Sequence, residues 1–332
     1  MVQIRVVVTE PEYVKGEATF QAAEDMDIRV SDWPEEELAE AVREHEAFGA
    51  VLGVENYSGA LYSALPRGGV LARFGVGHDG VDKMAATARG LLATNTPGVL
   101  EDAVAEHAIA LILGVAKNLN AFSLGMAAGE WTPRLGFELR GRTLGIVGCG
   151  GIGRRLARFA NAFGMTALGL EPDTAVHDEL RCDWGFAEVH TDLADVLSRA
   201  QILSLHVPVN EHTRHMVDAD FIAAMRENAI LVNTARGPVV DEGAVYDALV
   251  SGRLASAALD VFEAEPYVPV APGKDLRALP NVLLTPHVSS SSVEACQRMA
   301  SASLANVRQA FAGTYDAVSL INPDVLDVLS RS

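Results

Sequence analysis

The chain has 332 residues, of which 49% are hydrophobic and 21% are charged, a composition typical of a globular protein with sizeable cores. This length exceeds one ordinary domain and favours two domains of roughly 150 residues each. Lysines and arginines number 26 against 44 aspartates and glutamates, which gives a formal net charge of −18. A chain this acidic is not expected to bind nucleic acid or an anionic membrane surface.

The cysteines and the apolar segments indicate the compartment. Cys149, Cys182 and Cys296 are far apart and form no Cys-x-x-Cys or Cys/His cluster, so we expect neither a disulfide framework nor a metal site. The N-terminal apolar run lacks a cleavage-site pattern. The most apolar helix candidate, "AVAEHAIALILGVA", is interrupted by Glu106 and His107 and is too short to span a bilayer. We therefore expect a soluble, cytoplasmic protein with no membrane partner.

In the first part of the chain, short runs rich in Val, Ile and Leu alternate with helical stretches, which is typical of parallel α/β sheets. The pattern predicts strands over 4–9, 47–54, 70–77 and 91–96. A helix is predicted over 34–45, with Pro34 at its first position. A long helical segment over about 100–128 follows and ends in the loop-like stretch "GEWTPRLGFELRG".

The second part opens with a strand, a tight turn and a helix in "TLGIVGCGGIGRRLARFANAFG". Further strands are predicted over 166–172, 201–208, 229–237, 256–262 and 281–288, and an amphipathic helix over about 292–312. This pattern predicts two doubly wound α/β domains. Because the last helix follows a completed second domain, we expect it to return to the first. The expected domains are residues 1–99 with 288–332, and residues 100–287.

Gly148, Gly150 and Gly153 have the spacing G-x-G-x-x-G between an apolar strand and a helix. In a dinucleotide-binding turn, the first glycine permits the tight turn, the second lets the backbone approach a pyrophosphate, and the third lets helix and strand pack closely. The N-terminus of the helix attracts the phosphates. The next strand ends at Glu171, whose carboxylate would accept the ribose hydroxyls. A glycine turn without a ligand is the alternative.

Three polar residues, Arg236, Glu265 and His287, each follow a predicted strand of the second part. Open α/β sheets bind ligands at the carboxyl ends of their strands, so these side chains are expected to converge. An arginine binds a carboxylate in a bidentate way, and a histidine moves a proton near neutral pH when a carboxylate orients it. Singly, Glu265 fits a surface carboxylate and Arg236 a structural ion pair; together the three favour a catalytic site.

The strings "NTARGPVVDEGAV", "SAALDVFEAEP" and "LPNVLLTPH", with "VGCGGIGRR" and "RFGVGHDGVDKMAATARGLLATNTPGVLEDAVAEHAIALIL" upstream, resemble the D-isomer-specific 2-hydroxyacid dehydrogenase family. The resemblance covers roughly residues 45–325. It implies a flavodoxin-like substrate domain (residues 1–99 and 288–332) and a Rossmann NAD-binding domain (residues 100–287) with a cleft between them. It also implies a homodimer held largely by the coenzyme domains, with the segment near 100–128 in the interface.

The resemblance also implies roles for single residues. Arg236 would bind the carboxylate of a small 2-hydroxy or 2-keto acid, and His287, paired with Glu265, would be the general acid in reduction and the general base in oxidation. The backbone N–H groups of Val76 and Gly77 would meet the same carboxylate. The further contacts implied for NAD are Gly151 and Ile152 at the pyrophosphate, Thr234 and Ala235 along the coenzyme, Asp260 near the nicotinamide, and Ser290 near the carboxamide.

For three histidines the sequence allows both a functional and a purely structural role. His206 would lie near the adenine pocket or be purely structural, and His78 would approach the substrate cleft or not. His107 fits a packed interface residue better than a catalytic one. NAD is expected over NADP, because Glu171 would repel a 2′-phosphate and the following "PDTAVHDE" contains no lysine or arginine.

The same fold also occurs in non-enzymatic NAD(H)-sensing corepressors, which retain the dyad, but this chain lacks long extra tails and an enzyme is favoured. Formate dehydrogenases are disfavoured because they resemble this pattern with a glutamine where Glu265 stands. Phosphoglycerate dehydrogenases usually carry an arginine in the loop that here reads "ENYSG", where this chain offers Glu55 and Asn56. Glu55 either faces the substrate there or points to solvent and plays no part. We therefore expect a side chain without phosphate, as in glyoxylate or hydroxypyruvate, unless Arg134, in a loop that the family can lend across the dimer, supplies a positive charge.

Overall fold

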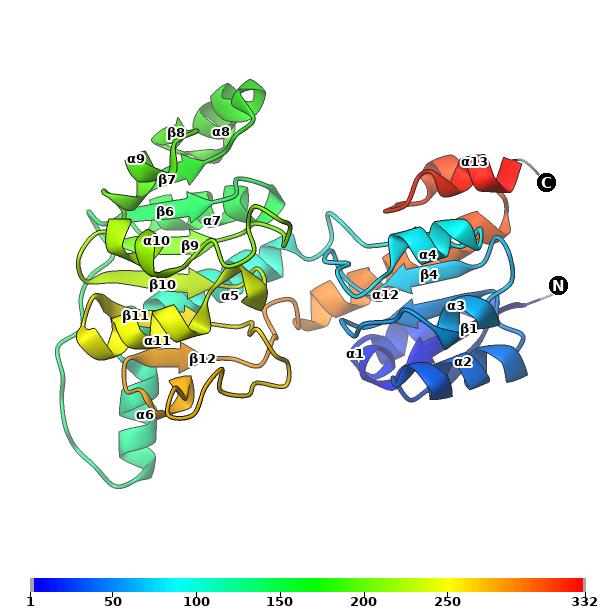
Figure 1. Cartoon of the computed structure of the whole chain (residues 1–332), viewed down its shortest axis with the longest axis horizontal. Coiled ribbons are helices and arrows are strands. Elements are labelled where there is room, and N and C mark those ends of the chain that lie inside the picture. The colour runs from blue at the N-terminus through cyan, green and yellow to red at the C-terminus, as the bar shows by residue number, and fades with distance from the viewer. Residues whose placement is uncertain (1–2, 331–332) are drawn as a thin grey trace. The chain divides into compact units, whose positions relative to one another are not determined.

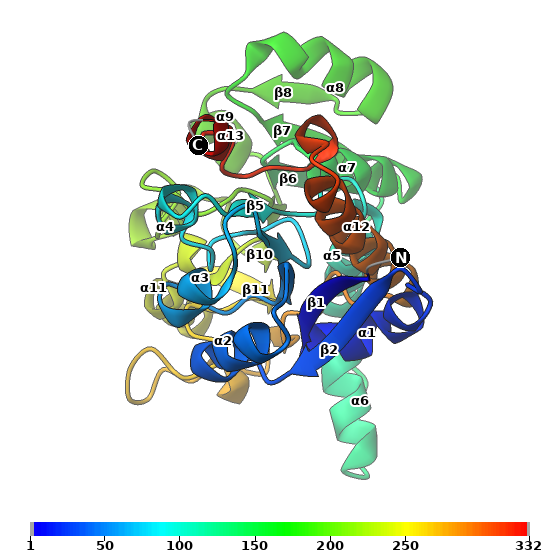
Figure 2. The same cartoon turned by 90° about the vertical axis from the view of Figure 1, so that its right-hand side faces the viewer.

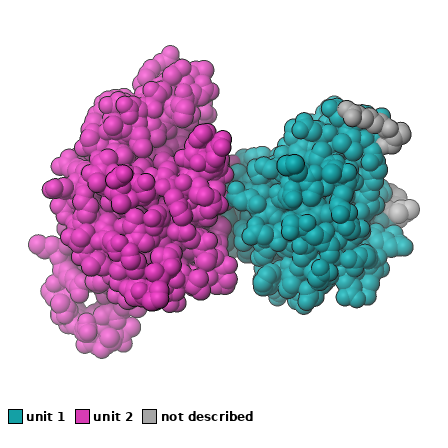
Figure 3. Space-filling model, viewed as in Figure 1, with its two compact units in different colours: residues 1–100, 290–332 teal, residues 101–289 magenta. Residues whose placement is uncertain are grey.

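A computed structural model describes residues 3–330 and divides the chain into two compact units. Unit 1 comprises residues 1–100 and 290–332, and unit 2 comprises residues 101–289, coloured separately in Figure 3. Leu100, which we expected in the second domain, belongs to unit 1, and Val288 and Ser289, which we expected in the returning segment, belong to unit 2. Each unit has a single, fully parallel sheet, so the predicted fold class of two doubly wound α/β domains is confirmed.

The sheet of unit 1 has the order β2-β1-β3-β4-β5, which is the flavodoxin-like order. Its strands are β1 (Ile4–Thr9), β2 (Met26–Ser31), β3 (Gly49–Leu52), β4 (Val70–Arg73) and β5 (Leu92–Thr94). Strand β2 was not predicted. It lies at one edge of the sheet, where most of its residues are partly exposed to solvent, and its sequence "MDIRVS" accordingly alternates apolar and polar residues.

Helices cover both faces of this sheet. Figure 2 shows α1 (Glu10–Gln21) and α12 (Val293–Phe311) on one face, and α2 (Glu35–Glu44) and α3 (Ala60–Ala64) on the other. The remaining elements are α4 (Lys83–Ala88), the short 3₁₀ turn Tyr315–Ala317 and α13 (Val325–Ser330). The C-terminal segment is tied to the sheet, because the Asn322 side chain accepts a hydrogen bond from the backbone of Ala93 in β5 at 2.9 Å.

The sheet of unit 2 has the order β12-β11-β10-β9-β6-β7-β8. Its strands are β6 (Thr143–Val147), β7 (Thr166–Leu170), β8 (Glu188–His190), β9 (Ile202–Leu205), β10 (Ala229–Asn233), β11 (Leu254–Leu259) and β12 (Val282–Leu284). The chain reverses its direction of winding between β6 and β9. Such a switch point is where open α/β sheets bind their ligands.

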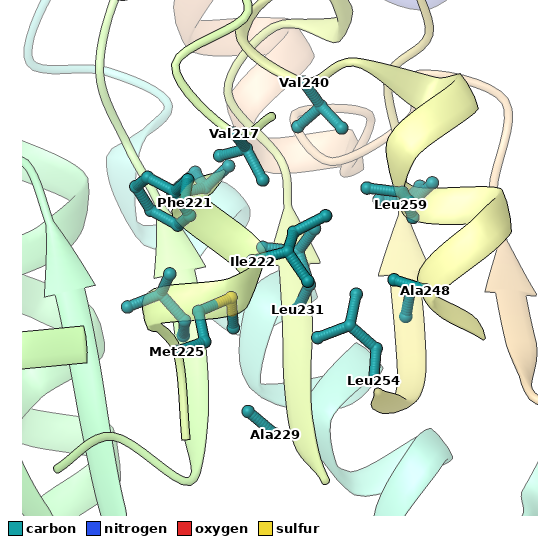
Figure 4. Close-up of a cluster of buried hydrophobic side chains, with 14 of the residues drawn as sticks. Val217, Phe221, Ile222, Met225, Ala229, Leu231, Val240, Ala248, Leu254 and Leu259 are labelled. Atoms are coloured by element: carbon teal, nitrogen blue, oxygen red, sulfur yellow. The ribbon is translucent and has the colours of Figure 1, made fainter. Parts of the chain in front are cut away.

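Two hydrophobic clusters flank this sheet, and strand β10 contributes to both. Ile230 and Val232 pack in the cluster of α5 (Glu101–Ala116) and α7 (Gly151–Ala162). Leu231 points the other way, into the cluster of Figure 4 beneath α10 (Ala219–Ala224) and α11 (Glu242–Ser251). The other elements are α8 (His177–Trp184), α9 (Leu193–Leu197) and 3₁₀ turns at Thr174–Val176, Gly237–Val239 and Leu276–Ala278.

The prediction of a single helix over about 100–128 is wrong. Two helices, α5 and α6 (Leu119–Ala127), meet at a bend of 66°, where Asn118 has a φ of 55°. No residue of α6 is buried, and α6 projects from the body of unit 2 in Figure 1. Within residues 3–330, no single helix is long and apolar enough to cross a membrane; α5 and α6 together pass that test by length and composition only, as a bent pair.

Candidate active site

Five neighbouring strands of unit 2 end in register. The paired residues at their ends are Val147 with Leu205, Leu205 with Asn233, Asn233 with Leu259, and Leu259 with Leu284. The next residue of each strand therefore falls on one row along the carboxyl edge of the sheet. This row consists of Gly148, His206, Thr234, Asp260 and Thr285.

The glycine turn has the geometry that a pyrophosphate requires. Gly148 has a φ of 95°, and a Cβ on Gly153 would lie 2.3 Å from the carbonyl oxygen of Gly148. Gly150 caps α7 without a side-chain hydrogen bond, and a Cβ built on it would meet nothing within 4 Å. Gly151 and Ile152 form the first turn of α7. The unpaired N–H groups of this turn therefore face open space, where an anion can bind.

Glu171 lies beside this turn, because the residue before it, Leu170, pairs with Val147 of β6. Its carboxylate accepts a hydrogen bond from the backbone of Asp173 at 3.1 Å. The two arginines of the turn already have carboxylate partners. Arg154 pairs with Glu179 at 2.8 Å, and Arg155 pairs with Asp102 at 2.5 Å.

Two buried polar atoms of the row, Nδ1 of His206 and Oγ1 of Thr234, have no hydrogen-bond partner within the described residues. The other ring nitrogen of His206 is 2.9 Å from the Ser204 hydroxyl. Burial lowers the pKa of His206 to about 4, so its ring is neutral at neutral pH. Ala235 follows Thr234 and is also buried. The open glycine turn, Glu171 and these unpartnered atoms fit a dinucleotide.

Arg236 is held in a fixed turn after β10. The buried side chain of Asn233 donates to the backbone oxygen of Arg236 at 2.8 Å and accepts from the backbone of Ala235 at 3.0 Å. A Cβ on Gly237 would lie 1.8 Å from the carbonyl oxygen of Phe262, so only glycine fits there. This close approach brings the loop of Arg236 against the segment that leads to Glu265.

His287 and Glu265 form a close pair, with 2.6 Å between Nδ1 of the ring and Oε2 of the carboxylate. The side chains are 25% and 29% exposed, so both remain accessible to a ligand. The other oxygen of Glu265 accepts from the backbone of Phe262 at 3.0 Å. Because Glu265 engages Nδ1, the ring presents Nε2 as its proton-exchanging atom.

Asp260, which we predicted near the nicotinamide, has partners that the sequence did not indicate. It is fully buried, and its carboxylate accepts from the Thr285 hydroxyl at 2.6 Å and from the backbones of Val288 and Ser289, both at 2.9 Å. The carboxylate therefore anchors the segment that carries His287. Only the strand register and the turn after β12 bring these groups together.

The remaining predicted residues lie in unit 1. Val76 and Gly77 follow β4, and within residues 3–330 their N–H groups have no acceptor. Glu55 follows the neighbouring strand β3, and its loop packs on theirs: a Cβ on Gly80 would lie 2.1 Å from the carbonyl oxygen of Glu55. Ser290 is the first residue of the second segment of unit 1 and is half-buried, as is His78.

Glu12, on α1, was missed by the sequence analysis and lies next to Glu55. A Cβ on Gly53 would come within 2.3 Å of Oε2 of Glu55 and within 2.9 Å of Oε2 of Glu12. Glu12 is buried and is 2.5 Å from the Thr9 hydroxyl and 3.2 Å from the Lys15 ammonium. Burial, reinforced by the charge of Glu12, raises the pKa of Glu55. No local pattern could have revealed this pair, because it depends on how α1 packs against β3.

A site for a dinucleotide next to a histidine that a carboxylate orients belongs to an oxidoreductase. Residues 109–289 match the family model described as "D-isomer specific 2-hydroxyacid dehydrogenase, NAD binding domain". The chain belongs to the D-isomer-specific 2-hydroxyacid dehydrogenase family.

Curated proteins and solved structures agree with this family. The chain is 38% identical over 300 residues to a glyoxylate reductase of Thermococcus litoralis, covering 87% of each chain. It is 33% identical over 301 residues to a hydroxypyruvate reductase of Thermotoga maritima, covering 90% of this chain and 95% of the relative. It also matches the crystal structure of an NADPH-dependent glyoxylate/hydroxypyruvate reductase from Sinorhizobium meliloti in complex with NADP and malonate, with a TM-score of 0.79, 32% identity and 94% of each chain covered.

The protein is therefore an NAD-dependent oxidoreductase that interconverts a 2-hydroxy acid and its 2-keto acid. This confirms the predicted family, reaction class and cofactor. The comparisons give no support to the alternative of a non-enzymatic NAD(H)-sensing scaffold.

Proposed function

We propose that this protein reduces glyoxylate or hydroxypyruvate with NADH, and that Arg236, Glu265 and His287 are its catalytic residues. The observation that carries the proposal is the 2.6 Å pair of His287 with Glu265, beside a sheet edge equipped for a dinucleotide. The names of the relatives from Thermococcus litoralis and Thermotoga maritima support the choice of substrate.

NADH, when bound, supplies the hydride. His287 donates a proton from Nε2 to the carbonyl oxygen of the keto acid, and the charge of Glu265 stabilises the protonated ring before this transfer. Arg236 binds the substrate carboxylate and polarises the carbonyl, since a guanidinium forms a bidentate pair with a carboxylate. The free N–H groups of Val76 and Gly77 bind the same carboxylate.

The proposed coenzyme contacts follow the row and the turn of unit 2. Glu171 accepts the ribose hydroxyls, while His206 and Thr234 offer the coenzyme their unpartnered atoms. NAD is preferred over NADP, because Glu171 repels a 2′-phosphate and the nearby arginines are already paired with carboxylates. The other contacts are Gly148, Gly150, Gly151, Ile152 and Gly153 at the pyrophosphate, Ala235 along the coenzyme, and Asp260 and Ser290 at the nicotinamide end.

The preference for a substrate without phosphate is supported by the two carboxyl groups of Glu12 and Glu55, which follow β1 and β3 at the carboxyl edge of the unit 1 sheet. A carboxylate a few ångströms from a phosphate costs about a kilocalorie per mole or more at an effective dielectric constant of about 20. A hydroxyl, by contrast, can donate a hydrogen bond to either group. Hydroxypyruvate therefore suits this edge better than phosphohydroxypyruvate.

We also propose that the protein is a homodimer of the cytoplasm. Helix α6 and the loop after it expose apolar side chains, namely Leu119, Leu124, Met126, Trp131 and Leu135. A large apolar surface on a monomer is costly in water, and a second copy would cover it. Arg134 lies in the same loop and would enter the interface with it. The three free thiols fit a reducing compartment.

The test is to incubate the protein with NADH or NADPH and a panel of 2-keto acids, and to follow the nicotinamide absorbance. We expect NADH oxidation with glyoxylate and hydroxypyruvate, and a lower kcat/KM with NADPH and with phosphohydroxypyruvate. A clear preference for the phosphorylated compound would overturn the proposed role of the Glu12–Glu55 edge. Turnover of none of the keto acids would overturn the proposed substrate class.

A further inference from the structure

His107, on α5, begins a chain of hydrogen bonds within unit 2. Its Nε2 is 3.1 Å from the Thr285 hydroxyl, and that hydroxyl donates to the carboxylate of Asp260 at 2.6 Å. A threonine hydroxyl has one proton, and here it goes to Asp260. His107 must therefore be the donor to Thr285. The same nitrogen lies 3.5 Å from Asp260, so both contacts draw His107 toward the carboxylate.

The chain ends on three consecutive backbone N–H groups. Those of Val288 and Ser289 donate to the carboxylate of Asp260, and that of His287 donates to its backbone oxygen at 2.7 Å. His287 has a φ of 52°, a left-handed conformation that is unfavourable for a residue with a side chain. Such a conformation persists where the surroundings determine it, and here Asp260 holds it.

Asp260 can serve as this anchor because it is charged. Burial alone would favour its neutral form, but the hydrogen bonds from His107, Thr285, Val288 and Ser289 outweigh burial and hold its pKa below the usual range. A buried carboxylate that loses one donor is destabilised and shifts toward another partner. Removing the donor from α5 would therefore disturb the segment that carries His287.

We propose that His107 is a positioning residue: by donating to Thr285 it fixes Asp260, and through Asp260 it fixes the backbone of His287 and so the position of the ring relative to its substrate. This inference rests on the proposed catalytic role of His287. Helix α5 is thereby linked to the acid–base pair through a continuous chain of hydrogen bonds.

The test compares His107→Phe, which keeps a ring but removes the donor, with His107→Gln, which keeps an N–H group at similar reach. We expect His107→Phe to lower kcat for hydroxypyruvate by about tenfold, since small misplacements of a catalytic group cost up to about a hundredfold. The Kd for NADH should change by less than kcat, because most of the proposed coenzyme contacts lie at the glycine turn and at Glu171, and His107→Gln should restore most of kcat. His212→Phe, at a histidine whose side chain is 85% exposed, is the control and should leave kcat unchanged.

Thr285→Val removes the middle link at nearly constant shape. If the chain acts as a unit, the double variant His107→Phe with Thr285→Val should be no slower than the slower single variant. Losses in kcat that multiply, an unchanged kcat in His107→Phe, or equal losses in His107→Phe and His107→Gln would overturn the proposal. Thr285→Val and His107→Gln carry the test if His107→Phe does not fold.

A readout without turnover separates this inference from the proposed function. The proton between His287 and Glu265 should give a downfield NMR resonance that is absent from His287→Ala. We expect this resonance to shift or broaden in His107→Phe and to stay in place in His212→Phe. If the resonance is unchanged in His107→Phe, the inference fails even if the wild-type enzyme is active. If wild type reduces no keto acid but the resonance does shift, only the proposed substrate and catalytic roles fail.

Discussion

At the residue scale, the candidate site depends on short contacts that fix which atom of each side chain remains available. Glu265 uses one oxygen for the backbone of Phe262 and the other for His287, so the ring is held by its Nδ1. The backbone of His287 is held separately, by Asp260. Orientation of the ring and placement of its backbone therefore depend on different residues, and they can be tested separately.

Glu265→Gln removes the negative charge beside His287 and keeps the shape of the side chain. The ring loses the carboxylate that holds it by Nδ1 and that stabilises its positive charge during proton transfer. We therefore expect kcat for hydroxypyruvate to fall by about tenfold or more. The measurement is kcat of Glu265→Gln beside wild type in the same buffer. An unchanged kcat would show that the pair does not act in catalysis.

The buried ring of His206 leads to a prediction about how the free energy of unfolding depends on pH. Its pKa is lowered to about 4 in the folded protein, whereas an unfolded histidine titrates near about 6.5. Between these values the unfolded chain binds a proton that the folded protein does not. The contribution of His206 is therefore complete above about pH 6.5 and is lost as the pH falls toward about 4.

Urea unfolding at pH 7 and pH 5 tests this directly. Because part of the ring reaches solvent, we expect wild type to lose only about 1 to 2 kcal/mol more than His206→Asn between these pH values. His212→Asn, at an exposed position, should lose as much as wild type. The same loss in His206→Asn and wild type would show that the ring is not buried in its neutral form.

At the element scale, α6 differs from the other long helices because none of its residues is buried. The helix α5 before it is largely buried within unit 2, and the chain turns at Asn118. The sequence predicted one helix here, since the apolar character continues across the break and Asn118 is the only local sign of it. An apolar helix with no buried residue is the surface that the second copy would cover in the proposed homodimer.

Leu124→Glu should therefore weaken the proposed homodimer, because a charge replaces an apolar side chain that is 64% exposed. We expect sedimentation velocity to show a dimer for wild type and mostly monomer for this variant. Val250→Glu on α11 is the matched control, since Val250 is 62% exposed, and it should remain dimeric. A dimeric Leu124→Glu, or a monomeric wild type, would contradict the proposed interface.

At the scale of the whole molecule, the sequence predicted the features that repeat along a doubly wound fold. Buried strands such as β1 and β10 are nearly continuous runs of Val, Ile and Leu, and the residues after them fall on one edge by topology. The edge strands β2 and β8 escaped prediction because they are short or polar. The pairs Glu12 with Glu55 and His107 with Thr285 were not predicted for a different reason. Each pair joins elements that are distant in sequence.

The central claim is that His287 transfers the proton in an NADH-dependent reduction of hydroxypyruvate. The most direct measurement is kcat of His287→Ala beside wild type, with the Kd for NADH measured by nicotinamide fluorescence in the same preparations. We predict a kcat about two to four orders of magnitude lower and an unchanged Kd, as expected when a general acid is removed. A variant that keeps more than about a tenth of wild-type kcat would contradict the claim, since loss of a general acid typically costs at least about a hundredfold.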